Sequence, residues 1–348
     1  MTDRYARQTI LTEVGPEGQA RLAAATVLVV GAGGLGCAVL PYLAATGVGR
    51  LIIIDHDRVE ESNLHRQPLY RTGDVGQLKV LAARAALAAL NPATGIEAQC
   101  ERFSSVNAAP LVDRANVVID AADSFAVTYL LSDTCQHAGK PLVSASVLGL
   151  SGYVGVFCGS APSYRAVFPE LPRTAGSCAE SGVLGTAVGV MGTLQAHLAL
   201  AVLLNWQPPV AGRLLSVDFR TLHLGGFSFA GAAEPLEQPI PFIAPAEVGG
   251  TDIVIDLRST SETPLSPFPT ALRVGVETLE NAQLQLPTEP RIVLCCRSGL
   301  RAWRAAQALR SQGHANLALL ALGERARSSS SRAATRAAGR ASRVMYAP

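Results

Sequence analysis

Short apolar runs alternate with longer segments of helical period over most of the chain. The runs lack polar positions, as in strands whose two faces are both buried. The predicted strands are 27–30, 51–54, 96–102, 117–119, 141–147, 153–157 and 214–217. Helices are predicted at 35–46, 79–90, 107–114 and 129–138. This alternation predicts an α/β fold with a doubly wound, mostly parallel sheet of the Rossmann-like kind.

The pattern divides the chain into parts. Residues 1–224 are predicted to form the first domain, and residues 225–250, rich in Gly, Ala and Pro, a linker. A second, smaller α/β domain is predicted at 251–323. Residues 324–348 consist mainly of Ser, Ala and Arg without apolar period, which predicts a disordered tail. A solvated end explains this tail better than an RNA-binding role.

Residues 183–204 carry no charge and have the length of a membrane span. Three glycines, Gln195 and His197 interrupt this stretch, and α/β sequence flanks it on both sides. A buried core helix or dimer-interface helix is therefore favoured over a span, and no membrane partner is predicted.

Composition narrows the class of protein. The chain has 348 residues, 49% of them hydrophobic, and a formal net charge of +2, which favours no nucleic-acid partner. Its seven cysteines are odd in number and include no C-x-x-C pair, so neither a disulfide framework nor a thiolate zinc site is expected. With no secretory signal before Arg4, we expect a cytoplasmic protein.

A glycine-rich turn follows the first strand. Gly31, Gly33 and Gly36 have the spacing G-x-G-x-x-G, and a helix begins near Leu35. Such a turn lets the backbone approach a phosphate, and the helix N-terminus faces it. Asp55 ends the second strand, where a ribose hydroxyl is usually held. The pattern predicts a nucleotide site, the alternative being a tight turn in an ordinary sheet, and it leaves NAD, FAD and ATP open.

The residues after Asp55 favour one nucleotide. Asn63, Arg66, Gln67 and Lys79 bring two cations and two carboxamides to the mouth of the glycine turn. This set suits a triphosphate whose α-phosphate gains charge as it is attacked. The alternative is that Arg66 and Lys79 are surface charges.

Asp123 follows the buried strand at 117–119 and can bind Mg²⁺ that bridges phosphates. Alternatively, Asp120 or Asp123 caps the next helix.

Several motifs together resemble the MoeB/ThiF enzymes, the bacterial relatives of ubiquitin-activating enzymes. They are R-Y-A-R-Q at 4–8, GAGGLG at 31–36, Asp55, S-N-L-H-R-Q at 62–67, G-x-x-G-x-x-K ending at Lys79, Asn91-Pro92, D-x-x-D-S-F at 120–125 and S-C-A-E-S-G-V-L-G at 177–185. The resemblance implies a homodimer that binds ATP and Mg²⁺ and adenylates the C-terminal glycine of a ubiquitin-like sulfur-carrier protein ending in Gly-Gly.

The resemblance also implies roles for matching residues. Asp55 would hold the ribose, Asp123 would bind Mg²⁺, and Arg7 would reach into the partner subunit's site. Cys178, on a crossover loop, would either act as a functional thiol or have no role. The phosphates would be contacted by Gly31, Gly33, Gly34, Gly36, Asn63, Arg66, Gln67 and Lys79.

The chain departs from the family pattern in three places. The C-x-x-C expected at 163–166, and a second one after the strand near Asp218, are absent, so no structural zinc is expected and another contact must hold the loop. Thr128 stands where the family has an arginine, and Tyr153 where it has a glutamine. These two changes predict altered carrier recognition.

The second domain resembles a rhodanese. Residues 253–258 match its first strand, and C-R-S-G-L-R at 296–301 matches the loop that carries the persulfide cysteine. Cys296 at a helix start, near Arg297 and Arg301, predicts a reactive thiolate. This thiolate would receive its sulfur from a persulfide sulfur donor. The expected His-Ile-Pro-Gly-Ala segment is missing near 268–276. A degenerate domain is the alternative.

These patterns predict a nucleotidyltransferase with sulfurtransferase activity that makes a thiocarboxylate, for molybdopterin, thiamine or a related sulfur pathway. Two rival functions stay open: adenylation of a tRNA base or peptide, and an NAD-dependent oxidoreductase, which Arg66 and Lys79 disfavour. A non-catalytic binding protein is a third possibility.

Overall fold

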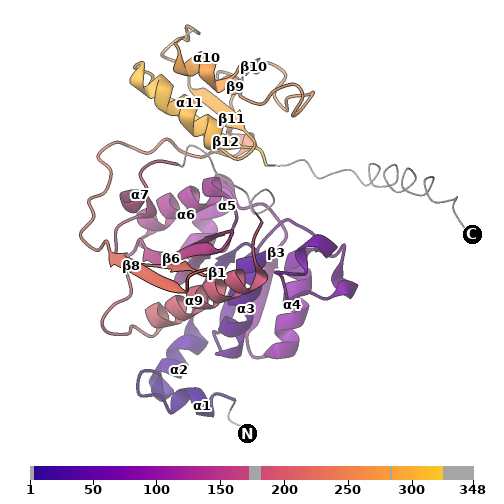
Figure 1. Cartoon of the computed structure of the whole chain (residues 1–348), viewed down its shortest axis with the longest axis vertical. Coiled ribbons are helices and arrows are strands. Elements are labelled where there is room, and N and C mark those ends of the chain that lie inside the picture. Colours follow the sequence, from indigo (N-terminus) through magenta and orange to yellow (C-terminus); the bar gives the residue numbers. More distant parts are fainter. Residues whose placement is uncertain (1–3, 172–181, 283, 324–348) are drawn as a thin grey trace, which may run out of the picture.

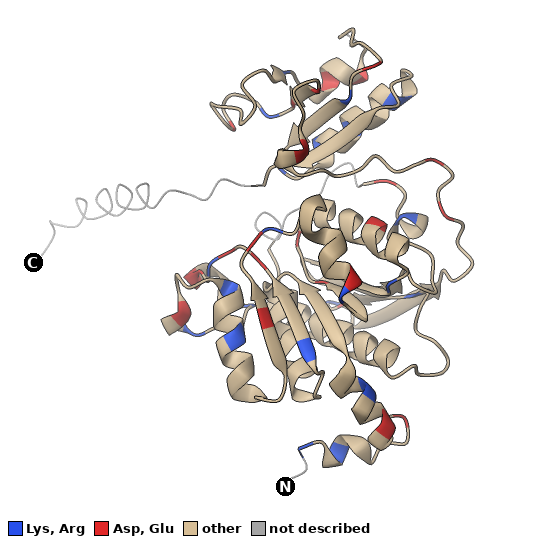
Figure 2. Cartoon of the chain, turned by 180° about the vertical axis from the view of Figure 1, so that it is seen from behind, with Lys and Arg blue, Asp and Glu red and all other residues tan. Residues whose placement is uncertain are grey.

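The computed structural model describes residues 4–171, 182–282 and 284–323, which form two sheets flanked by helices (Figure 1). The smaller sheet and its helices lie beyond α5, α6 and α7 of the larger unit, whereas α1 and α2 lie at the opposite end (Figure 1). Figure 2 shows the same arrangement from behind. The predicted α/β fold with two sheets of unequal size is confirmed.

The large sheet has eight strands in the order β3-β2-β1-β4-β5-β6-β7-β8. Strands β3 to β5 are parallel, and β6, β7 and β8 continue the sheet antiparallel to their neighbours. Their bounds are β1 Thr26–Val30, β2 Arg50–Ile54, β3 Gly95–Gln99, β4 Val117–Asp120, β5 Leu142–Leu148, β6 Ser151–Phe157, β7 Arg213–Asp218 and β8 His223–Ser228.

Helices cover both faces of this sheet. Their bounds are α1 Ala6–Thr9, α2 Gly15–Ala24, α3 Gly34–Ala45, α4 Lys79–Leu90, α5 Ser105–Asp113, α6 Phe125–Ala138, α7 Tyr164–Val167 and α9 Gly185–Leu203. Strand β1 shows why both faces are apolar: Leu28 and Val30 enter one hydrophobic cluster, while Val27 and Val29 enter the cluster on the other face. Because the strands from β3 to β5 are parallel, their carboxyl ends lie together at one edge of the sheet, which is polar and holds the site described below.

The first domain runs further than predicted. Residues 225–228, assigned to the linker from their two glycines, belong to β8, which pairs antiparallel with β7 at the edge of the sheet. Gly226 leaves the space that this pairing needs, because a Cβ there would lie 2.4 Å from the carbonyl oxygen of Leu214. A glycine pair is therefore compatible with an edge strand as well as with a linker.

The uncharged stretch near the middle of the chain forms α9, the one described helix long and apolar enough for a membrane span. It packs inside the first domain, against α3 and the large sheet. Gly192 contacts α3 so closely that a Cβ would lie 2.7 Å from the Cβ of Ala38, and the buried Gln195 donates to the backbone carbonyls of Asp120 and Val143. The predicted core role of this helix agrees with these contacts.

The smaller domain is a parallel sheet in the order β10-β9-β11-β12. The strands are β9 Ile253–Asp256, β10 Leu272–Arg273, β11 Ile292–Cys296 and β12 Leu317–Ala321, and the helices are α10 Val276–Glu280 and α11 Leu300–Ser311. The segment before it is not a loose linker, because Phe242 is buried and forms a bridge with Leu319 of β12.

Candidate active site

The glycine turn between β1 and α3 has the geometry that its sequence predicts. Gly31 has a φ of +102°, and a Cβ there would lie 2.5 Å from the carbonyl oxygen of Ala121. At Gly36 a Cβ would lie 2.2 Å from the carbonyl oxygen of Gly31, while at Gly34 it would lie 2.7 Å from Val188. Gly33 differs, since its nearest neighbour would be Gln67 at 3.8 Å. Gly31 and Gly36 are thus required by the backbone around them, a Cβ at Gly34 would displace Val188, and Gly33 leaves an open side to the turn.

Asp55 fixes the turn against the end of β2. One of its carboxylate oxygens accepts from the backbone N–H of Ala32 at 2.8 Å, and the other accepts from the N–H of Asp57 at 2.7 Å. The hydroxyl of Tyr70 donates to the carbonyl oxygen of Ala32 at 2.7 Å. Each Asp55 oxygen keeps a lone pair for a further donor, such as a ribose hydroxyl.

Lys79, the first residue of α4, points its side chain into this group of carboxylates. It is 5% exposed, and its Nζ lies 2.9 Å from a carboxylate oxygen of Asp57. Burial alone lowers the pKa of Lys79, but neighbouring carboxylates outweigh burial and raise its pKa above the ordinary value; they belong to Asp55, Asp57 and Asp123. The lysine is therefore a fixed positive charge rather than a surface charge.

Asp57 is a member of the site that the sequence analysis missed. Burial raises its pKa, but Lys79 outweighs burial and lowers the pKa below the ordinary value. With Asp55 and His56 it also forms a group whose possible ligand atoms all lie within 4.8 Å of one another. Its position two residues after Asp55 in a polar loop was the available signal, but the partner Lys79 is distant in the sequence.

Arg66, Asn63 and Gln67 lie on the loop that faces the glycine turn. Arg66 donates to the side-chain oxygen of Asn63 at 2.8 Å and to the backbone oxygen of Ser62. Gln67 is 2% exposed, and its side-chain oxygen has no partner among the described residues. The Gln67 atom nearest to Gly33 is its amide nitrogen, whose N–H can donate to a phosphate oxygen at the open side of the turn. The residues present therefore fit a nucleotide.

The two aspartates after β4 have different environments. Asp120 is buried and accepts from the hydroxyls of Thr128, at 2.7 Å, and Ser144, at 2.8 Å. Burial raises the pKa of Asp120 to about 6. Asp123 is exposed at the polar edge of the sheet, and its charge acts on Lys79. Of the two, Asp123 is accessible to a metal ion, whereas Asp120 is enclosed by its hydrogen-bond partners.

Thr128 acts inward. It stands where the family resemblance led us to expect an arginine, and it is buried with its hydroxyl on Asp120. The Thr128 side chain therefore serves the interior of the first domain. That the lost arginine alters carrier recognition stays a prediction.

The structure does not bring Arg7 to this site. Its neighbour Tyr5 packs on Gly47, after α3, and accepts from the side chain of Asn91, after α4. Both helices end at the edge of the sheet opposite the glycine turn, because they run antiparallel to the strands. Arg7 is exposed there and does not reach the glycine turn of its own chain.

Cys178 lies outside the described residues. In the small domain, Cys296 ends β11 and is fully buried, and its sulfur accepts from the backbone N–H of Gly299 at 3.1 Å. Cys295 points to the other face of the small sheet, where burial raises its thiol pKa to about 12. These two neighbours therefore differ in environment.

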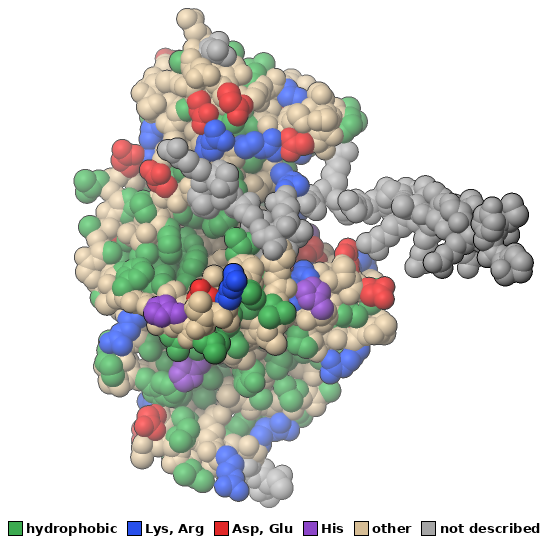
Figure 3. All heavy atoms as spheres, viewed as in Figure 1, with side chains coloured by type: hydrophobic (Ala, Val, Ile, Leu, Met, Phe, Trp, Pro, Cys, Tyr) green, Lys and Arg blue, Asp and Glu red, His purple; other side chains and the backbone are tan. Residues whose placement is uncertain are grey.

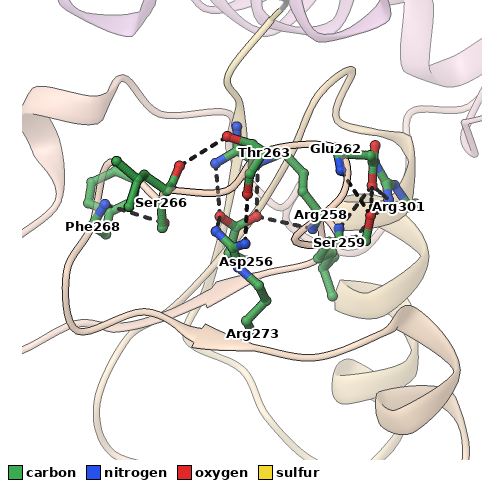
Figure 4. Close-up of polar contacts among 11 residues, drawn as sticks. Asp256, Arg258, Ser259, Glu262, Thr263, Ser266, Phe268, Arg273 and Arg301 are labelled. Carbon is green, nitrogen blue, oxygen red and sulfur yellow. Dashed lines mark hydrogen bonds and ion pairs between the residues drawn. The ribbon is translucent and has the colours of Figure 1, made fainter.

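Figure 4 shows a polar network around Asp256 and Glu262 in the small domain. Arg258 binds both oxygens of the buried Asp256, at 2.9 and 2.8 Å, and Arg301 forms two short contacts, 2.7 and 2.6 Å, with Glu262. Pairing with Glu262 raises the pKa of Arg301, and the charge interaction with Cys296 raises it further, so Arg301 lies near the cysteine as expected from the sequence. The network fixes the loop after β9 against α11.

Comparisons with known proteins agree with this geometry. The model of the ThiF family matches residues 5–236. The chain is 49% identical over 224 residues to a sulfur carrier protein adenylyltransferase of Thermus thermophilus, covering 62% of this chain and 83% of the relative. It is 49% identical over 218 residues to adenylyltransferase and sulfurtransferase MOCS3 of Bos taurus. That match covers 62% of this chain and 48% of the bovine protein, so it spans about half of the bovine protein's length.

A longer match reaches the small domain. Adenylyltransferase and sulfurtransferase MOCS3 of Drosophila ananassae is 34% identical over 356 residues, covering 89% of this chain and 79% of the relative. Among solved structures, Escherichia coli MccB with ATP superposes with a TM-score of 0.58 at 20% identity, covering 66% of this chain and 72% of that one, which shows a shared fold. The chain belongs to the ThiF family.

Proposed function

We propose that the protein adenylates the C-terminal glycine of a ubiquitin-like sulfur-carrier protein with ATP and Mg²⁺, and that its small domain then supplies sulfur. The observation that carries the first part is the buried, charged Lys79 among three carboxylates beside the glycine turn. The names of the Thermus and MOCS3 relatives support the carrier and the sulfur transfer.

The adenylation needs no general base, because the carrier carboxylate is an anion at pH 7. A carboxylate oxygen attacks the α-phosphorus, the bond from that phosphorus to the bridging oxygen breaks, and pyrophosphate leaves. Lys79 and Arg66 hold the phosphates and offset the charge that develops there. Mg²⁺ held by Asp123 would neutralise further phosphate charge. Gly33, Asn63 and Gln67 would position the triphosphate.

The sulfur step starts from a persulfide on Cys296, received from a persulfide donor. Its terminal sulfur attacks the acyl carbon, AMP leaves, and carrier and Cys296 are joined by an acyl disulfide. A dithiol reductant then supplies two electrons: it releases the carrier thiocarboxylate, returns Cys296 to a thiol and becomes a disulfide itself. All six described cysteines are free, which suits this chemistry and a reducing cytoplasm.

A homodimer is part of the proposal. Figure 3 shows apolar side chains gathered on the face that carries α9 and β8. The exposed members on those elements and the turns beside them are Leu184, Val190, Leu222, Leu224 and Phe227. Such a surface is typical of a subunit interface. Arg7, exposed at the end opposite the glycine turn, would then serve the partner subunit.

The test is ATP–pyrophosphate exchange with a Gly-Gly-ended carrier. We expect exchange with the intact carrier and none with a carrier lacking its last two glycines. Asp123→Ala should abolish exchange, whereas Cys296→Ala should retain exchange and stop thiocarboxylate formation. Absence of exchange with every Gly-Gly-ended carrier tried would contradict the proposal. Labelling of a tRNA or peptide by radioactive AMP would then support the rival acceptors.

A further inference from the structure

The segment 163–166, where the family resemblance led us to expect a C-x-x-C pair, is held by charged contacts. Ser163 caps α7, and its backbone N–H and hydroxyl both donate to the carboxylate of Glu234 at 2.6 Å. Arg165 donates to both oxygens of Asp133 in α6, at 2.6 and 2.9 Å. This short helix is thereby fixed to α6.

Arg165 also reaches the small domain. Its guanidinium carbon lies 4.7 Å from the ring centroid of Tyr129 and 5.7 Å from that of Trp303, which belongs to α11. Arg165 and Trp303 are each 5% exposed. A buried arginine requires both an ion pair and good packing, and Asp133 supplies the first while the two rings supply the second.

Trp303 lies in the first turn of the helix that follows the Cys296 loop. In that loop a Cβ at Gly299 would lie 2.8 Å from the ring of Phe242 and 3.7 Å from the Cβ of Ala126. Ala126 is in the first turn of α6, three residues after Asp123. The loop that carries Cys296 therefore packs beside the loop that carries the proposed Mg²⁺ ligand, in the same subunit.

The two adjacent cysteines show which face of the small sheet is docked. Cys296 belongs to a hydrophobic cluster that includes Ala126 and Tyr129 of the large domain. Cys295 belongs to a separate cluster formed only by small-domain residues and the segment before them. Separation of the domains should therefore change the surroundings of Cys296 and leave those of Cys295 intact.

We propose that Arg165 and Trp303 form an anchor between the domains that positions the Cys296 loop next to the Asp123 loop of the same subunit for sulfur transfer. The role in sulfur transfer rests on the proposed function, whereas the docking does not. Arg165 and Trp303 are positioning residues, since neither contacts the reacting atoms.

The first test measures docking without activity. The full chain is alkylated with iodoacetamide, and the rate at each cysteine is followed by mass spectrometry. Arg165→Met and Trp303→Ala should raise the Cys296 rate severalfold, whereas Trp303→Phe should preserve the wild-type rate. Arg304→Met is the matched control, because the ion-pair partner of Arg304 among the described residues is Glu280, inside the small domain.

Cys295 reports unfolding. Its thiol should stay unreactive in every variant. If Cys295 reacts in Trp303→Ala, the small domain of that variant has unfolded. The docking is then judged from Arg165→Met, which changes the large domain. An unchanged Cys296 rate in Arg165→Met would overturn the anchor. So would a wild-type Cys296 that reacts as fast as the exposed Cys100.

The second test measures transfer. In Arg165→Met and Trp303→Ala, kcat for thiocarboxylate formation should fall about tenfold, because the sulfur is no longer held near its target. KM for the carrier and ATP–pyrophosphate exchange should not change. Unchanged kcat with raised Cys296 alkylation would overturn the positioning role. Loss of exchange in the wild type would instead contradict the proposed function, and alkylation alone would then decide the docking.

Discussion

The ammonium nitrogen of Lys79 lies 2.9 Å from a carboxylate oxygen of Asp57, beside the glycine turn. Lys79 is buried while Asp57 is about half exposed, so the pair places a positive charge where the phosphates are proposed to bind. Lys79→Met removes that charge. We expect the rate of ATP–pyrophosphate exchange to fall by about 10²-fold or more, as for the loss of one preorganised charge at a reacting phosphate.

The free energy of unfolding should change by less than about 1 kcal/mol in Lys79→Met, because Asp57 remains accessible to water. Urea unfolding measures this change. Lys79→Arg, which keeps the charge, should retain more exchange than Lys79→Met. Equal activity of Lys79→Met and the wild type would show that the lysine does not act on the phosphates.

Thr128→Val tests whether this position serves stability or carrier recognition. It removes a donor to the buried Asp120 and leaves that carboxyl with fewer partners. We expect a loss of about 1–2 kcal/mol in urea unfolding, with an unchanged KM for the carrier. The control is Thr134→Val on the same helix, whose hydroxyl donates to a backbone oxygen of the preceding turn. A raised KM without loss of stability would return Thr128 to carrier recognition.

Gly36→Ala should destabilise the first domain severely. The added methyl would lie 2.2 Å from the carbonyl oxygen of Gly31, so β1 and α3 would have to separate. We expect a loss of about 2 kcal/mol or more by thermal unfolding. Gly73→Ala is the matched control, because nothing lies within 4 Å of a Cβ there. Equal melting temperatures of the two variants would contradict the packing described for the turn.

Local patterns predict most of the fold. Helix α4 has the predicted bounds, and the glycine turn, Asp55 and Asp123 share one edge of the sheet as expected, because these features depend on period and strand order. Strand β8 was missed because paired glycines also mark linkers. The contacts of Arg165 with Asp133 and Trp303 were not predictable, because a pair between residues far apart in sequence leaves no local signal.

The buried Asp120 predicts a pH dependence of opposite sign to that of a salt-bridged carboxylate. Its pKa is raised from 3.8 to about 6, so between these values the folded chain binds a proton that the unfolded chain has lost. The stability that this carboxyl contributes is complete below about pH 4 and is lost as the pH rises through about 6.

Asp120→Asn removes this titration while keeping an acceptor for Thr128 or Ser144. The free energy of unfolding of the wild type relative to Asp120→Asn should therefore fall between about pH 4 and 6 and stay level above about pH 7. Urea unfolding of both proteins from pH 4 to 8 measures this difference. Asp113→Asn, at an exposed position of α5, is the control and should show no such slope. A difference that grows with pH would mean that Asp120 is stabilised as a carboxylate in the folded protein. The hydrogen bonds from its hydroxyl partners would then contribute more free energy than burial of the charge costs.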